Sequence, residues 1–203
     1  LPEVVELDPH DTVVALKERT KVIALFDEEV RHWQGVPQSY HLHGFFNEGI
    51  SIETITLHPA LMGAQLPDPA LMKDYNKLAV LGCRTIETET EGRVLNNPLS
   101  SWPLIWYWLK PVDVARVQKA ALIASEVLFA AGARRVLLPF NAAGNELDDP
   151  RALEDEGLCP AGPAALQMMA FHPLGTCGAG RVVGWDQGAG PGVVVADGSV
   201  VPE

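Results

Sequence analysis

One histidine, His172, stands in the segment FHPLGTCGAG, which runs from Phe171 to Gly180 and is rich in glycine. An imidazole group has an unperturbed pKa of about 6.5, so it can accept or release a proton near neutral pH. Glycine allows backbone conformations and close approaches that other residues do not. These residue types favour a site at which a proton acceptor lies beside backbone that can pack closely against a ligand. A purely structural histidine is the alternative.

Other residues that could bind a metal do not form a convincing site. His41 and His43 are two positions apart, which places both on one face of a strand, but no third ligand is evident. The cysteines are widely spaced and form no Cys-x-x-Cys pair, which disfavours a zinc site or a dithiol redox centre. They are Cys83, Cys159 and Cys177. We therefore expect reduced thiols and no bound metal.

Two glycine clusters could suggest a nucleotide site, GAGRVVG at 178–184 and GAGPG at 188–192. The first has one residue too many for the dinucleotide fingerprint, and the second contains a proline where a helix should begin. The fingerprint also needs a strand before it and a helix after it, so that the pyrophosphate meets a helix N-terminus. Here a loop precedes and a strand follows, so no such loop is expected in this sequence.

The charge of the chain excludes two classes of partner. Its 26 acidic and 15 basic residues give a net charge of −11, which repels nucleic acid backbones and anionic lipid headgroups. The apolar runs are far shorter than the roughly 20 residues that span a bilayer, so no transmembrane segment is expected. No basic segment followed by an apolar stretch is visible near Leu1. We expect a cytoplasmic protein.

The elements that must position His172 begin with strands. The segment TVVALKERTKVIALF predicts two strands, 12–16 and 22–26, joined by a charged turn at 17–19. The segment 83–95 alternates Ile and Thr with Glu, which predicts a strand with a solvated glutamate face. Further strands are expected at 39–46, 49–57 and 102–109.

Helices are expected beside this sheet. Apolar residues recur at helical spacing over 111–131, and Gly132 follows as a cap. A second helix is expected at 163–170, directly before His172. The whole pattern predicts an α+β fold in which residues 1–165 form an antiparallel sheet with helices packed on one face. Residues 166–203, which end in a valine-rich strand, are expected to belong to a different, α/β layer.

The sequence resembles the glucose-methanol-choline (GMC) family of FAD-dependent oxidoreductases. The resemblance rests on HPLGTC at 172–177 followed by VVADGSVVP at 194–202, which are similar to the two C-terminal motifs of the family. It extends back through GFFNEGISIETITLHPALMGAQLP, EGRVL and KPVDVARVQKAALIASEVLFAAGARRVL, which look like the substrate-binding portion of the bacterial alcohol- and sterol-oxidising branch.

The resemblance implies an alcohol oxidation in which FAD accepts a hydride and His172 accepts the hydroxyl proton or orients the hydroxyl. Gly175 and Thr176 would let backbone lie close to the flavin ring. Asp197 and Gly198 would contact the ribityl and pyrophosphate part of FAD. On this basis residues 1–165 are a substrate-binding domain and residues 166–203 return to an FAD-binding domain.

The sequence also departs from the family. Gly178-Ala179-Gly180 replaces a frequent Arg-Met-Gly, and the N-terminal FAD-binding region with its glycine fingerprint is missing. We therefore expect a fragment that binds no FAD and is inactive alone, its partner being the missing FAD-binding region. The alternative is a stand-alone, non-catalytic binding or interaction module. The apolar residues Trp102, Ile105, Trp106 and Trp108 favour a hydrophobic alcohol as substrate of the complete protein.

Overall fold

The computed structural model describes the following residues: 13–90, 92–95, 97, 99–100, 102–141, 143–155, 157–160, 162–174, 183–186, 190–194 and 200–202. Twelve strands, two α helices and four 3₁₀ helices (η) lie in these ranges. Within them, no helix combines the length and the apolar character that crossing a membrane requires.

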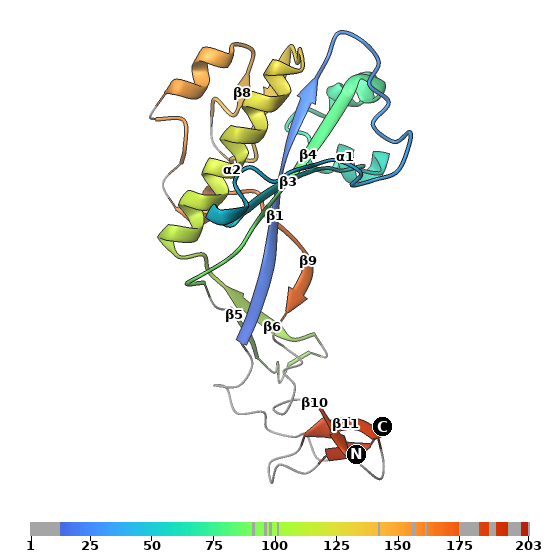
Figure 1. Ribbon diagram of the computed structural model, residues 1–203, viewed down its shortest axis with the longest axis vertical. Helices are drawn as coiled ribbons and strands as arrows, with labels where there is room; N and C mark the ends of the chain where they lie inside the picture. The colour runs from blue at the N-terminus through green and yellow to red at the C-terminus, as the bar shows by residue number, and fades with distance from the viewer. Residues whose placement is uncertain are drawn as a thin grey trace.

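Strand β1, Val13–Leu25, is the centre of the main sheet (Figure 1). It is one continuous strand, so the predicted hairpin with a turn at 17–19 is wrong. Lys17 to Arg19 lie inside a ladder, because β9 pairs with residues 15–19 and β4 pairs with residues 19–25. These charged residues can lie inside a strand because β4 and β9, which come from distant parts of the sequence, pair with their backbone.

The main sheet has nine strands in the order β2-β3-β4-β1-β5-β6, with β7 and β9 on β1 and β8 on β7. All of its pairings are antiparallel. The strands other than β1 are β2 His41–Leu42, β3 Ile50–Thr54, β4 Leu78–Thr85, β5 Gly92–Leu95, β6 Leu104–Tyr107, β7 Arg135–Leu137, β8 Glu146–Leu147 and β9 Met169–Leu174. The short connecting helices are η1 Phe46–Glu48 and η3 Pro150–Glu154.

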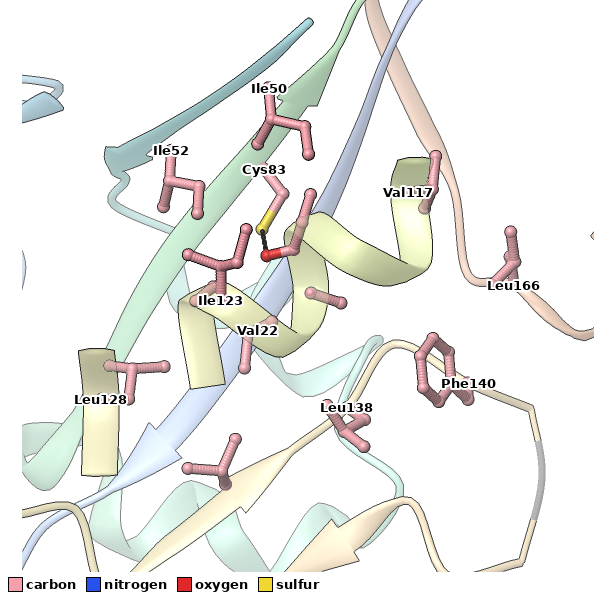
Figure 2. Close-up of a cluster of buried hydrophobic side chains, with 14 of the residues drawn as sticks. Val22, Ile50, Ile52, Cys83, Val117, Ile123, Leu128, Leu138, Phe140 and Leu166 are labelled. Carbon is pink, nitrogen blue, oxygen red and sulfur yellow. Dashed lines mark hydrogen bonds between the residues drawn. The ribbon is translucent and has the colours of Figure 1, made fainter. Parts of the chain in front are cut away.

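Helix α2, Pro111–Ala130, packs across one face of this sheet. Five of the six residues predicted to face the core are buried, namely Val114, Val117, Ala121, Ala124 and Leu128, whereas Ala131, just after the end of the helix, is exposed. They meet alternate residues of the strands, and Figure 2 shows Ile123 of the helix beside Cys83 and Ile52. The predicted α+β fold, built on an antiparallel sheet, is confirmed, but the helices do not all lie on one face as predicted, because further helices cover the opposite face.

The end of α2 follows the predicted glycine cap. Gly132 has a φ of 95°, in the left-handed region that favours glycine, and its N–H donates to the carbonyl of Phe129 at 2.9 Å. The N–H of Ala133 donates to the carbonyl of Leu128 at 3.0 Å, which satisfies a second carbonyl of the last turn.

The opposite face of the sheet carries a second, smaller apolar layer. Ile23 and Leu25 of β1 point to it, whereas Val22 and Ala24 point to α2, as the period of a strand requires. The layer is closed by helix α1, Pro59–Gly63, and by the 3₁₀ helix η2, Pro69–Lys77. The sheet is therefore covered on both faces near the C-terminal half of β1.

Two predicted elements differ in the structure. Strand β4 ends at Thr85, so 83–95 is not one alternating strand; residues 86–90 form a turn whose backbone is bound by a buried carboxylate of α2. The predicted helix at 163–170 is only the single 3₁₀ turn η4, Pro163–Ala165, after which Leu166 bridges to Phe140. His172 is therefore part of a strand, β9, and does not follow a helix.

A second, three-stranded sheet is formed near the C-terminus. Its order is β10-β11-β12, both pairings are antiparallel, and it shares no ladder with the main sheet. The strands are β10 Val183–Asp186, β11 Gly190–Val194 and β12 Val200–Pro202. The valine-rich segment of the sequence thus supplies β11 and β12.

Candidate functional site

The position of His172 is fixed by the ladder between β9 and β1. Met169 lies opposite Arg19, and His172 lies opposite Lys17. The register shifts between these pairs, because Ala170 lies opposite Glu18 and Phe171 has no partner. This is a β-bulge, which moves position 172 opposite residue 17 where an unbroken ladder would place it opposite residue 16. Bulges are frequent beside active sites, since they re-aim the residues that follow.

A cavity of about 370 Å³ lies where β9 begins. Four segments from distant parts of the sequence form its wall: β1, the loop after α1, the loop after β7 and the segment leading into β9. The lining residues are Lys21, Ala64, Gln65, Leu66, Pro67, Asn141, Gln167, Met168 and Met169. The side chains of four of them carry amide or ammonium groups, so this wall is polar. Met169, which lines the cavity, and His172 therefore lie in the same strand, β9.

Among the described residues of this wall, Lys21 carries the only charged side chain. It is 6% exposed, and its ammonium nitrogen Nζ lies 3.6 Å from the thioether sulfur Sδ of Met169. Among the side chains that the structure describes, which do not include those of residues 13–19 and 170–174, no acidic group forms a salt bridge with it. Burial lowers the pKa of Lys21 from 10.5 to about 8, because the charged form loses its hydration. A strongly perturbed, buried cation in a cavity is a physical marker of a functional site.

The amide groups around Lys21 are held by the loops. Gln65 directs its Nε2 to the same Met169 sulfur at 3.2 Å, and its carbonyl oxygen Oε1 is buried without a hydrogen-bond partner among the described residues. Gln167 donates to the side-chain oxygen of Asn141 at 3.0 Å, and its backbone carbonyl accepts from the hydroxyl of Thr20 at 3.0 Å. These bonds fasten the segment before β9 to β1.

The sequence-predicted site residues are placed only in part. His172 lies in β9, near the cavity along the strand. Gly175, Thr176, Asp197 and Gly198 lie outside the described residues, so their predicted contacts with FAD stay predictions.

The sequence reasoning missed Lys21. The available signal was one lysine directly before the apolar run Val22 to Leu25, in a strand whose two faces are both buried there.

The other candidate groups have structural surroundings. The rings of His41 and His43 stack with centroids 5.4 Å apart, and His41 Nδ1 lies 3.6 Å from the buried carboxylate of Glu53. No three potential metal-ligating side chains gather anywhere in the part of the chain that the structure describes. Cys83 and Cys159 are free thiols, and burial raises the pKa of both.

Only the end of the tryptophan-rich segment lines a described pocket, because Trp108 and Leu109 lie in the wall of a pocket of about 540 Å³ at the start of α2. Leu104, Ile105 and Trp106 of the edge strand β6 are 51%, 66% and 66% exposed, and Trp102 and Trp108 are exposed as well. The described part of the chain therefore leaves an apolar strand open on both faces.

The described fold is an α+β unit built on an antiparallel sheet, with a polar cavity on one face. No family model matches the chain. It is similar to two proteins named uncharacterized GMC-type oxidoreductase, from Mycobacterium tuberculosis strains H37Rv and CDC 1551. Each is 29% identical over 200 residues, which cover 93% of this chain and 31% of the relative.

The chain thus spans about a third of the length of these curated relatives. Their names support the GMC resemblance and suggest an oxidoreductase. They do not specify an alcohol, a sterol or a cofactor.

Proposed function

We propose that this chain is one part of a GMC-type, FAD-dependent oxidoreductase that oxidises an alcohol. The observation that carries the proposal is the position of His172: the histidine of the HPLGTC motif lies in β9, the strand that also contributes Met169 to the polar cavity. The two GMC-type relatives, which match the chain over most of its length, support the same reading.

His172 would act as the base of this reaction. Oxidation of an alcohol removes a hydride from carbon and a proton from oxygen, and no protein side chain accepts a hydride. The flavin of the complete protein would supply that acceptor. An imidazole with a pKa near neutrality can take the hydroxyl proton or hold the hydroxyl in place. The β-bulge at Phe171 would set the direction from which His172 meets the substrate.

The described residues do not fit the pyrophosphate of FAD. A pyrophosphate binds at a free helix N-terminus, but the two longest helices each begin beside a carboxylate. Asp113 is buried in the first turn of α2, and Asp68 caps η2 by accepting from the N–H of Ala70 at 2.8 Å. We therefore expect the pyrophosphate to be bound mainly by regions that the relatives have beyond the matched third, and the turn with Asp197 and Gly198 to contact the ribityl and pyrophosphate part of FAD, as the resemblance implies.

Residues 1–165 would then be the substrate-binding domain, and residues 166–203 a segment of the FAD-binding domain. Strand β9 follows this boundary and pairs with β1, so backbone hydrogen bonds would join the two parts beside the site. The substrate would be a hydrophobic alcohol of the kind that the alcohol- and sterol-oxidising branch uses. The exposed apolar strand β6 would meet another part of the complete protein or the substrate.

The test is the variant His172→Ala in the complete protein that contains this chain. Turnover of an alcohol should fall by about 10² to 10⁴, because a general base contributes that much, while bound FAD is retained. The matched control is His43→Ala, which removes an exposed histidine that follows edge strand β2, away from β9, and should leave turnover unchanged.

Unchanged turnover in His172→Ala would contradict the assignment of the base. A complete protein that binds no flavin would contradict the oxidoreductase, and would favour the alternative of a non-catalytic binding module.

A further inference from the structure

The ammonium group of Lys21 is buried without a compensating charge in the described part of the chain. Removing a cation from water costs several kcal/mol unless an anion or several hydrogen bonds replace the water. The partner that the structure gives Lys21 is the thioether of Met169, which is a weak acceptor. Lysine side chains are almost never fully buried in proteins unless they are paired, so an unpaired buried lysine suggests that a ligand supplies the partner.

A second group in the same cavity also lacks its partner. Gln65 Nε2 contacts the same Met169 sulfur as Lys21 Nζ, so the two side chains are neighbours around one atom. Gln65 Oε1 is buried and accepts no hydrogen bond from the described residues. The cavity therefore presents a cation that needs an anionic oxygen, and a carbonyl that needs a donor.

The size and charge of the cavity limit the ligand. A volume of about 370 Å³ is at the lower end of small-molecule sites. Lys21 is the one charged residue among the described residues of the lining, which suits a monoanion better than a phosphate dianion.

We propose that this cavity binds a hydroxycarboxylate, with Lys21 paired to the carboxylate and Gln65 Oε1 accepting from the hydroxyl. Lys21 is then the residue that selects an anionic ligand in this cavity. The binding itself does not depend on the proposed function.

The experiment is calorimetric titration of the folded chain near neutral pH with β-hydroxyhexanoate, β-hydroxyhexanamide, hexanoate and inorganic phosphate. β-Hydroxyhexanoate should bind saturably, and the uncharged amide at least tenfold more weakly, because a charge-assisted hydrogen bond is lost. The variant Lys21→Met should weaken binding of β-hydroxyhexanoate at least tenfold. Lys73→Met, which removes an exposed lysine of η2, should leave it unchanged.

The role of Gln65 is read from a second variant. Gln65→Met should weaken binding of β-hydroxyhexanoate several-fold and leave binding of hexanoate unchanged, because only the former has a hydroxyl to donate.

Equal affinities of the wild type and Lys21→Met would overturn the proposal. So would binding of phosphate without β-hydroxyhexanoate, or the absence of any binding by a chain that circular dichroism shows to be folded. Because these titrations need no flavin, a complete protein that fails to oxidise alcohols would refute the proposed function and leave this site standing.

Discussion

At the scale of single residues, Lys21 destabilises the fold in which it is buried. Its pKa is about 8 in the folded chain and 10.5 as the ordinary value. Below pH 8 the folded chain must hold a buried charge, and this penalty is fully present. Between pH 8 and pH 10.5 the folded chain releases the proton while the unfolded chain keeps it, so the contribution of Lys21 to stability rises with pH.

Replacing the charge should therefore stabilise the protein. We expect Lys21→Met to raise the free energy of unfolding by roughly 1–3 kcal/mol near neutral pH, because methionine fills similar space without a charge. The gain should shrink as the pH rises from 8 towards 10.5.

Urea unfolding of both proteins at several pH values measures this difference, and the comparison cancels groups that titrate in both. A Lys21→Met protein that is less stable than the wild type near neutral pH would show that Lys21 is held by interactions that outweigh its burial.

The two site residues illustrate what a sequence reveals about a site. His172 was predicted because it stands in a motif of adjacent residues. Lys21 was not, because its significance depends on Gln65, Asn141 and Met169, which approach it only in the folded chain. A lysine in a strand ordinarily indicates a solvated face of the sheet. In β1 both faces are buried at this point, so the lysine side chain is buried instead.

At the scale of elements, one carboxylate ties the turn 86–90 to helix α2. Asp113 accepts hydrogen bonds from the backbone N–H groups of Thr88, Glu89 and Thr90 at 3.0, 3.2 and 2.9 Å. The hydroxyl of Thr90 donates to it at 2.6 Å, and Arg116 pairs with it at 2.6 Å. Burial alone would raise the pKa of Asp113, but the donors, led by the Thr90 hydroxyl, outweigh it and hold the pKa below its usual value.

Removing this charge should loosen both elements. We expect Asp113→Asn to lower the free energy of unfolding by about 2–4 kcal/mol, since an amide cannot accept from all of these donors and leaves Arg116 unpaired. Because the folded pKa is lowered, the difference from the wild type should be present above the ordinary pKa of 3.8 and vanish as the pH falls through the folded value.

The measurement is chemical denaturation, with Asp27→Asn as the control. Asp27 is 76% exposed and pairs with Arg134 at 3.4 Å, so its loss should change stability by less than about 1 kcal/mol. Equal effects of the two variants would show that the buried network does not hold the turn.

Elements with a local cause were predictable, and elements with a distant cause were not. Helix α2 follows from the spacing of its own apolar residues and from Gly132, which are all within one segment. The continuity of β1 depends on β9, and the turn at 86–90 depends on Asp113, both of which lie far along the sequence. The same holds for residues 163–170, which were predicted to form a helix but enter strand β9 at Met169, because that strand pairs with β1.

At the scale of the whole molecule, the chain should not bind FAD by itself. The two longest described helices each begin beside a carboxylate, which disfavours a pyrophosphate there, and the sequence contains no dinucleotide loop. We expect the purified chain to be colourless, to bind no FAD at micromolar concentrations and to oxidise no alcohol. Titration of FAD with flavin fluorescence as the signal tests this directly. Saturable binding in the micromolar range would point to the glycine cluster at 178–184 as a nucleotide site.

The position of β1 also has a consequence for how the chain is made. Ile23 pairs with Leu137, and Lys17 pairs with His172. Strand β1 is therefore synthesised long before the strands β7 and β9 with which it pairs. At roughly 5–20 residues per second the delay is on the order of ten seconds. During that interval the edge of β1 that later accepts β7 and β9 offers unpaired backbone groups to any other strand. Pairings of such long range also slow folding itself. Chaperone capture, or assembly of β1 with a neighbouring copy, would compete with productive folding until β9 emerges and closes the edge.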